Sequence, residues 1–407
     1  MVTLNDIESA RSTLAGIITR TPLLNDRKLS KGSHEVYVKA ECLQRAGSFK
    51  IRGAYNKMTR LTDDEKARGV VAGSAGNHAQ GVALAATLNG IRSTIVMPEF
   101  APLTKIIATR DFGGEVVLKG ATFDEAVAHS RELQQEHGYT YVHAFDDEDV
   151  IAGQGTIGLE ILEDLPDVDV VVVPIGGGGI ISGIATAIKA VKPTVRVIGV
   201  QAANVPSVNT SLASGGPTTV DSQPTIADGI AVKRPGELTL PIIRELVDEV
   251  VEVTEDEIAR GVFHCAQNNR LVVEGAGAAG IAAIIAGKVN IADGEKAVTV
   301  LCGGNIDGNL LARVIEQVMV REGRYVIFKL LVVDRPGNLA EMLNQVAHAG
   351  ANVVEVFHQR AIWLAPLGRV GIEVILEVRD SSHATEVQLH LEKCGYHVER
   401  HDHHDWD

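Results

Sequence analysis

Short apolar runs alternate with helical patterns from about residue 69 to residue 150. The runs GVVAG and IRSTIVMP read as buried strands, and AQGVALAATLN between them reads as a helix that ends at Gly90. The segments LTKIIATRDF and TFDEAVAHSRELQQEHG repeat the helical pattern, and EVVLKG and YTYVHAF read as further strands. Strands that alternate with helices of this length are joined by right-handed crossovers, so the pattern predicts a mainly parallel sheet.

A second alternating block extends from about residue 155 to residue 310. The fully apolar run VDVVVVPI precedes four glycines and the segment IISGIATAIKAV, whose apolar stripe has the spacing of a helix packed on a core. VRVIGVQA and KAVTVLC read as later strands, and the polar, small-residue segment 208–224 is predicted to be a loop or flap. The two blocks predict an α/β protein whose strands are buried on both faces.

The pattern changes near residues 321–324. The segments that follow read in the order strand, helix, strand, strand, helix, strand, which predicts a separate ferredoxin-like domain over residues 324–407. The chain ends in HDHHDWD, whose histidines His401, His403 and His404 could bind a metal ion. Because such tails are more often solvated, we assign no metal site to them.

Composition excludes several classes of function. The 407 residues are enough for two or three domains, and the net charge of −14 argues against nucleic acid or an anionic membrane as partner. No segment reads as a signal peptide or a membrane span, so a soluble cytoplasmic protein is expected. No CxxC spacing that would indicate a disulfide framework or a zinc site occurs among the four cysteines, Cys42, Cys265, Cys302 and Cys394.

The segment AGSFKIRGA places Lys50 between the apolar residues Phe49 and Ile51. An ammonium group in apolar surroundings is costly, because desolvation disfavours the charged form. The amine could reach water along its own methylene stem. Alternatively, it could need to be neutral because it forms a covalent bond to a carbonyl. The segment alone leaves both interpretations open.

Three further loops, each following a predicted strand, bear on this choice. Gly176–Gly179 precede a helix, where backbone N–H groups bind anions. The third glycine of a dinucleotide fingerprint is displaced here, so a single phosphate fits this turn better than a dinucleotide does. Ser74–His78 also open a helix and could hold a carboxylate or simply cap that helix. Cys302 follows a central strand, where it could face a ligand or be a small buried residue. Together with Lys50, these loops indicate a site for a phosphorylated aldehyde held as a Schiff base.

Five motifs in the order SFKIRGA, SAGNHAQG, PIGGGG, TIADGIAV and CGGNIDG resemble those of the threonine/serine dehydratases of pyridoxal-phosphate fold type II. The resemblance covers roughly residues 5–320, and the segment with DRPGNLAEM is similar to a single ACT domain, a module that binds amino acids. It implies a catalytic domain over residues 1–320, with a smaller subdomain at about 52–150, and an ACT domain over residues 324–407.

The resemblance also implies roles for individual residues. Lys50 would hold pyridoxal 5′-phosphate and remove the Cα proton of the substrate. The other implied cofactor-binding residues are Phe49, Asn77, Gly176, Gly177, Gly178, Gly179 and Cys302, and the implied substrate-binding residues are Ser74, Ala75, Gly76, Asn77 and His78. A neutral Cys302 beside the ring nitrogen would not keep that nitrogen protonated, which favours prompt loss of the β-hydroxyl over transamination.

The implied reaction converts L-threonine to 2-oxobutyrate and ammonia, in isoleucine biosynthesis or threonine catabolism. Serine dehydratase and serine racemase are alternatives, but Ala75 stands where racemases carry a serine base. The ACT domain disfavours a β-replacement enzyme. An inert amino-acid sensor would have lost the lysine or the glycine turn, and the displaced glycine disfavours a nicotinamide oxidoreductase.

The resemblance also implies binding partners, and this sequence differs from the dehydratases at some positions. An amino-acid effector is expected at the ACT domain, and a homodimer or homotetramer is expected. The residues proposed for the effector are Pro336, Gly337, Asn338, Leu339 and Asn352. Relatives imply a cation near Asp228 or Glu274, but these two carboxylates could as well cap helices or pair with lysines. Cys42 and Ala46 differ from the residues common at their positions in dehydratases.

Overall fold

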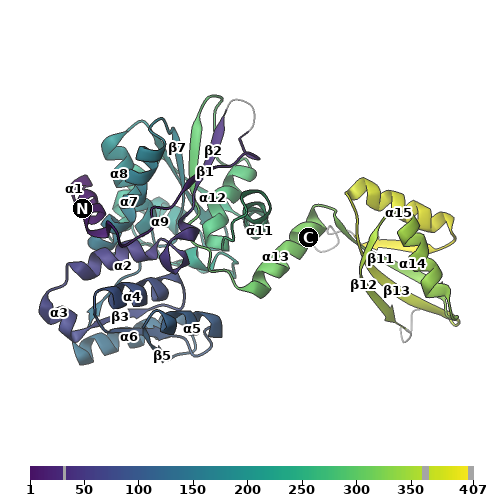
Figure 1. The fold of residues 1–407 in the computed structure, drawn as a ribbon, viewed down its shortest axis with the longest axis horizontal. Helices are drawn as coiled ribbons and strands as arrows, with labels where there is room; N and C mark the ends of the chain where they lie inside the picture. Colours follow the sequence, from purple (N-terminus) through teal and green to yellow (C-terminus); the bar gives the residue numbers. More distant parts are fainter. Residues whose placement is uncertain (31–33, 360–365, 402–407) are drawn as a thin grey trace. The chain divides into compact units, whose positions relative to one another are not determined.

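The computed structural model describes residues 1–30, 34–359 and 366–401, and the chain divides into two compact units, residues 1–307 and 308–407 (Figure 1). His403 and His404 of the predicted tail lie outside the described residues. Within the described residues, no helix is long and apolar enough to cross a membrane. Each unit is described by itself below.

A six-stranded sheet forms the larger half of the first unit, in the order β1-β2-β10-β7-β8-β9. Only β1 and β2 pair antiparallel, and the remaining pairs are parallel. The strands are β1 (Leu23–Asn25), β2 (Glu35–Lys39), β7 (Val170–Pro174), β8 (Arg196–Ala202), β9 (Glu249–Val253) and β10 (Lys296–Val300). The helices of this half are α1 (Leu4–Leu14), α7 (Glu148–Asp164), α8 (Gly179–Val191), α9 (Ser207–Ser214), α10 (Thr239–Leu246), α11 (Glu255–His264), the π-helix Cys265–Asn269 and α12 (Gly275–Ile285).

Both faces of this sheet are buried, as its continuous apolar runs predict. Along β7, Val171 and Val173 pack into the core formed with α7 and α8, and Val170 and Val172 pack into the core formed with α11 and α12. Successive residues of a strand point to opposite faces, so the four consecutive valines of one strand contribute to two cores. This arrangement confirms the predicted α/β class.

A four-stranded parallel sheet in the order β5-β4-β3-β6 forms the smaller half of the first unit. Its strands are β3 (Val70–Gly73), β4 (Ser93–Met97), β5 (Glu115–Leu118) and β6 (Thr140–Tyr141), and the helices around it are α2 (Lys50–Thr59), α3 (Asp63–Arg68), α4 (Asn77–Leu88), α5 (Leu103–Asp111) and α6 (Phe123–His137) (Figure 1). Short 3-10 helices cover Glu41–Leu43, Arg45–Gly47 and Asp228–Ile230. We call these two halves the large and the small subdomain.

The prediction of a loop over residues 208–224 is wrong in its first half. Residues Ser207–Ser214 form α9, which ends at Gly215 in the left-handed conformation. Val208 and Leu212 pack against the core beside α8, and Thr210 Oγ1 donates a hydrogen bond to Pro206 O (2.8 Å). Two apolar contacts on the core therefore stabilise a helix whose serines and threonines by themselves favour a loop.

The second unit has the predicted ferredoxin-like order. After α13 (Gly308–Arg321) come β11 (Tyr325–Val333), α14 (Asn338–His348), β12 (Asn352–Gln359), β13 (Arg369–Glu377), α15 (Ser381–Lys393) and β14 (His397–His401). The antiparallel sheet has the order β12-β13-β11-β14, and alternate residues of β11, such as Phe328 and Leu330, pack against α14 and α15. The helix α13 groups with this unit although it precedes residue 324, where the change of pattern was placed.

Candidate active site

Lys50 is the first residue of α2, and its amine is held inside the first unit. Its Nζ donates a hydrogen bond to Ala144 O (3.0 Å) and lies 5.0 Å from the centroid of the Phe49 ring. Burial lowers the pKa of Lys50 to about 8, although nearby Cys302 and Glu274 act in the opposite direction. Lys50 is only partly buried as a residue, but its Nζ turns to a backbone carbonyl, so the structure favours a neutral nucleophilic amine over a lysine that reaches out to water.

The glycine turn Gly176–Gly179 packs against Phe145, the residue that follows Ala144. A Cβ on Gly177 would come within 2.4 Å of the Phe145 ring, and one on Gly179 within 2.8 Å of Phe145 Cα. Gly178 has φ 97°, which L side chains rarely adopt. Side chains are therefore excluded from the turn by backbone conformation and by Phe145.

The turn carries unused hydrogen-bond donors. The backbone N–H groups of Gly176–Gly179 donate to no group in the part of the chain that the structure describes. They stand at the N-terminus of α8, where the helix dipole adds positive potential. Unpaired N–H groups at a helix start form a binding site for an anion such as a phosphate.

Ser74–His78 form a second turn of this kind, between β3 and α4. Gly76 N–H donates to Ser74 Oγ (3.3 Å), and a Cβ on Gly76 would meet no atom within 4 Å. The backbone N–H groups of Ala75, Asn77 and His78 donate to no described group. The turn thus presents free donors beside open space, which suits a carboxylate.

His78 contributes to this turn through its backbone and not through its ring. The ring Nε2 lies 2.8 Å from Val142 O, and burial lowers the pKa of His78 to about 3. A neutral imidazole that bonds a backbone carbonyl fixes α4 on the β6 loop. The side chain is therefore a structural contact.

Cys302 lies directly after β10 and is joined to the lysine loop by the backbone. Phe49 N–H donates to Cys302 O (3.2 Å), and Ser48 forms a β-bridge with Gly303. Burial raises the pKa of the Cys302 thiol well above its usual value, and the Glu274 carboxyl adds to the effect. Its Sγ lies 3.6 Å from Val300 O, so this group is a neutral thiol.

Asn77 lies between two polar side chains that the sequence did not indicate as its partners. Asn77 Nδ2 donates to Glu274 Oε1 (2.6 Å), and Asn305 Nδ2 donates to Asn77 Oδ1 (2.8 Å). Burial and Asp228 raise the pKa of Glu274 to about 7. Asn305 lies within the motif CGGNIDG, which the sequence showed, but the sequence did not show that Asn305 contacts Asn77.

The residues named for a cation have other partners. Asp228 Oδ2 pairs with Lys105 Nζ of α5 (2.6 Å), and Glu274 accepts from Asn77. No cluster of three or more potential metal ligands occurs among residues 1–30, 34–359 and 366–401. The motif TIADGIAV instead packs on the glycine turn, because a Cβ on Gly176 would come within 3.0 Å of Ile230 Cα.

The residues present fit a phosphorylated aldehyde. Segments far apart in the sequence contact the lysine loop or the glycine turn, and the glycine turn offers four unused backbone donors at a helix start. In addition, Ser48 Oγ is buried and has no hydrogen-bond partner in the described chain. Unpaired buried polar groups of this kind are expected where a polar ligand binds.

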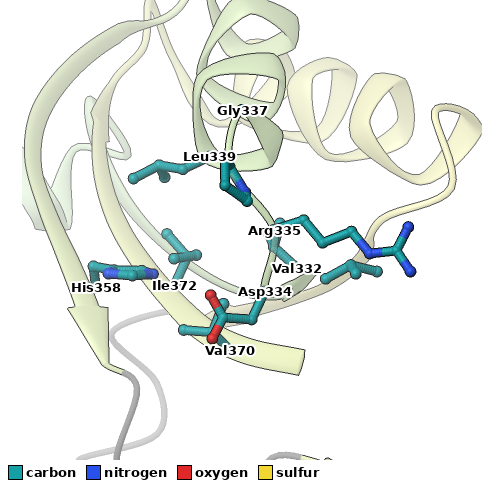
Figure 2. A pocket seen from close by; sticks show the side chains of 10 residues that line it. Val332, Asp334, Arg335, Gly337, Leu339, His358, Val370 and Ile372 are labelled. Carbon is teal, nitrogen blue, oxygen red and sulfur yellow. The ribbon is translucent and has the colours of Figure 1, made fainter. Parts of the chain in front are cut away.

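The second unit contains a separate cavity of about 200 Å³ at the turn between β11 and α14 (Figure 2). Of the residues predicted for an effector, Pro336, Gly337 and Leu339 line it. Asn338 Nδ2 instead donates to Val333 O (3.0 Å). Asn352 pairs across the sheet with Glu377, at the opposite end of β13 from the cavity, so the structure does not bring it to this site.

His358 and Ile372 also line this cavity, and the sequence did not indicate them. Figure 2 shows the His358 ring and the Asp334 carboxylate on opposite sides of the Ile372 side chain. The cavity therefore combines an apolar floor with both acidic and basic groups.

Comparisons with known proteins agree with this geometry. The family described as pyridoxal-phosphate dependent enzyme matches residues 14–303. An L-threonine ammonia-lyase of Thermotoga maritima is 51% identical over 399 residues, which are 98% of this chain and 99% of that protein.

Solved structures show the same likeness. The processed form of threonine deaminase isoform 2 from Solanum lycopersicum is similar with a TM-score of 0.72 and 40% identity, over 77% of this chain and 86% of that one. Maize serine racemase is similar with a TM-score of 0.73 and 35% identity, over 78% of this chain and 98% of that one. The chain therefore belongs to the family of pyridoxal-phosphate-dependent enzymes, within which it resembles the threonine ammonia-lyases, and its cofactor is pyridoxal 5′-phosphate.

Proposed function

We propose that this enzyme deaminates L-threonine to 2-oxobutyrate and ammonia. The observation that carries the proposal is the buried Lys50 amine, with its lowered pKa, among loops that offer separate donors for a phosphate and for a carboxylate. The full-length similarity to an L-threonine ammonia-lyase supports threonine as the substrate. Pyridoxal 5′-phosphate supplies an electron sink for the substrate's Cα.

In this proposal, each part of the site has one role. The N–H groups of Gly176–Gly179 would hold the phosphate, and the Phe49 ring would cover one face of the cofactor ring. Asn77 Nδ2 would donate to the ring oxygen, and the neutral Cys302 thiol would lie beside the ring nitrogen. The free N–H groups of the Ser74–His78 turn, those of Ala75, Asn77 and His78, would hold the substrate carboxylate. The resemblance implies these assignments, and the free N–H groups of the two turns and the neutral Cys302 thiol support them.

Lys50 would bind the cofactor and then act as the base. Its Nζ accepts the Cα proton of the substrate, which requires the neutral amine that burial favours. The β-hydroxyl then leaves, and the remaining enamine is hydrolysed by water to the 2-oxo acid and ammonia. A neutral Cys302 would not keep the ring nitrogen protonated, so the ring would take up less negative charge from Cα, which favours prompt loss of the hydroxyl.

Two alternatives use the same site. L-Serine differs from threonine by one methyl group, so a serine dehydratase needs only a different fit of the side chain. Racemisation needs a second proton donor on the opposite face of the substrate, and Ala75 offers none. A non-catalytic amino-acid sensor is disfavoured because Lys50 and the glycine turn are both retained.

The second unit would regulate this reaction by binding an amino acid in its cavity, as an ACT domain does. The cavity is lined by Gly337 at the N-terminus of α14 and by apolar groups such as Leu339 and Ile372. A helix start suits a carboxylate, and the apolar groups suit an aliphatic side chain. An end product such as isoleucine would place the enzyme in a biosynthetic pathway. We expect a homodimer or homotetramer.

The test compares substrates on the purified protein. We expect L-threonine to yield 2-oxobutyrate and ammonia in equal amounts, with a higher kcat/KM than L-serine. Formation of pyruvate from L-serine alone would assign a serine dehydratase, and formation of D-serine would assign a racemase. If none of these products forms in the presence of added cofactor, the sensor replaces the enzyme as the proposed function.

A further inference from the structure

Glu274 is a buried acid to which the proposed mechanism gives no task. The residue is 6% exposed and stands at the N-terminus of α12 in the large subdomain, where Glu274 N–H donates to Gly303 O (3.0 Å). Its Oε1 accepts from Asn77 Nδ2 (2.6 Å), and Asn77 opens α4 of the small subdomain. The hydrogen bond therefore joins the two subdomains at the site.

The Asn77 amide is held on both sides. Asn305 Nδ2 donates to Asn77 Oδ1 (2.8 Å) and also to Ala46 O (2.9 Å). The carboxyl of Glu274 takes the opposite end of the amide, so the two contacts together select one of its two orientations. The terminal torsion of an asparagine is broad, so the Glu274 contact adds a second restraint to the one that Asn305 provides.

The backbone encloses the Glu274–Asn77 hydrogen bond. A Cβ on Gly303 would come within 2.5 Å of Glu274 Oε1 and 2.8 Å of Asn77 Nδ2. A Cβ on Gly229 would lie 3.3 Å from the same carboxyl oxygen. The bond is therefore partly shielded from water, and a hydrogen bond in such surroundings is stronger than a fully exposed one.

Charged groups from several elements face this carboxyl. Burial and the Asp228 carboxylate raise the pKa of Glu274, and Lys105 of α5 and Lys50 of α2 act against them. The thiols of Cys42 and Cys302 are also close enough for Glu274 to raise their pKa. Glu274 can therefore carry either protonation state near neutral pH, and in both its Oε1 can accept from Asn77.

We propose that Glu274 is a positioning residue that acts through Asn77. It holds the amide so that one N–H of Nδ2 is used by Oε1 and the second is left for the cofactor. The proposal rests on the role of Asn77 in the proposed function. A carboxyl that only stabilised the fold would not need to act through this one amide.

The test is a double-mutant cycle on cofactor affinity. The apoenzyme of the full chain is titrated with pyridoxal 5′-phosphate, by absorbance, for the wild type, Glu274→Ala, Asn77→Ala and the double variant. We expect each single change to raise the apparent dissociation constant about tenfold, and the double variant to be no weaker than Asn77→Ala alone. Effects that simply multiply in the double variant would overturn the proposal, as would wild-type affinity in Glu274→Ala.

Glu274→Gln is the matched variant and does not depend on how well the alanine variant folds. The glutamine oxygen can accept the same hydrogen bond, so its dissociation constant should stay within about twofold of the wild type. A loss for Glu274→Gln as large as for Asn77→Ala would contradict positioning through a hydrogen bond. The product assay with L-threonine on the wild type is read separately, so failure of the substrate assignment leaves the cycle interpretable.

Discussion

Lys50 shows how much of the chemistry depends on one residue's surroundings. The sequence left open whether its amine reaches water or stays inside, because both interpretations place apolar residues on either side of it. In the structure, Lys50 Nζ donates a hydrogen bond to Ala144 O, and burial lowers the pKa of the amine to about 8. The amine is therefore neutral in a useful fraction of molecules near neutral pH.

This lowered pKa predicts how cofactor capture by the apoenzyme depends on pH. Only the neutral amine attacks an aldehyde, so the rate constant of capture should rise with pH and level off above about pH 9. For an ordinary lysine, with an unperturbed pKa of about 10.4, the rate constant of capture would still be rising at that pH. Stopped-flow absorbance after mixing apoenzyme with pyridoxal 5′-phosphate measures the rate constant.

A lysine-containing peptide treated in the same way is the control for the chemistry of the aldehyde itself. Its rate constant should continue to rise past the point where that of the enzyme becomes constant. A profile for the enzyme that follows the peptide up to about pH 10 would show that the Lys50 amine is not desolvated in solution.

Contacts between residues far apart in the sequence mark the limit of sequence reasoning at this scale. The sequence indicated Lys50, the glycine turn and Cys302 as site residues because each stands beside a strand or a helix start. The partner of Asn77 could not, because Glu274 is 197 positions away and no local pattern links the two. The packing of two sheets decides that contact.

At the scale of elements, α2 is held by a buried ion cluster that positions the first turn and with it Lys50. Arg52 is fully buried, and its guanidinium pairs with Glu41 Oε1 (2.8 Å) and Glu160 Oε1 (2.7 Å). Lys39 Nζ adds a second cation on Glu160 Oε2 (2.7 Å). The cluster joins β2, the 3-10 helix that follows it, α2 and α7.

Removing the central cation should destabilise the protein strongly. Arg52→Ala leaves Glu41 and Glu160 buried without their main partner, and breaking such a pair costs about 3–5 kcal/mol. The free energy of unfolding in urea, followed by circular dichroism on the full chain, measures the change. Cofactor affinity should fall too, because α2 carries Lys50.

Arg60→Ala is the control on the same helix. Arg60 is more than a third exposed and pairs with Asp149 (3.3 Å), so its loss should cost less than about 1 kcal/mol. Equal losses for the two variants would mean that the buried cluster contributes no more to stability than a surface ion pair does.

The elements themselves were largely readable from the sequence. Apolar runs between glycines located the strands, and 3.6-residue stripes located the helices around them. Residues 207–214 were missed because serine and threonine mask the helical signal, and only the contacts of Val208 and Leu212 with the core reveal it. Tertiary packing overrides local preference there.

At the scale of the whole molecule, the first unit carries the candidate active site and the second contains a separate cavity. The ferredoxin-like order of the second unit followed from the sequence, because its strands alternate inward and outward residues. The location of its cavity did not follow, since His358 and Ile372 reach it from β12 and β13 through the strand register. The turn Pro336–Gly337 was recognisable, whereas the residues opposite it were not.

This cavity predicts a variant that changes regulation alone. With L-threonine as substrate, we expect an aliphatic amino acid such as isoleucine to change the rate. His358→Ala should shift the half-maximal effector concentration about threefold or more, because a side chain that lines the cavity is lost, with the rate in the absence of effector unchanged. Initial rates over a series of effector concentrations measure this.

His348→Ala is the matched control, since His348 is an exposed histidine of α14 that bonds Asn344 O and does not line the cavity. It should leave the effector response as in the wild type. An equal shift in both variants, or no response of the wild type to any amino acid, would remove the regulatory role proposed for this cavity.

The central claim is that Lys50, among all lysines of the chain, holds the cofactor. Borohydride reduction of the cofactor-loaded enzyme fixes pyridoxal 5′-phosphate to the amine that binds it, and proteolysis with mass spectrometry then identifies the modified residue. We predict a single modified peptide that contains Lys50. Modification at another lysine, such as Lys57 on the same helix, with Lys50 left free would contradict the account.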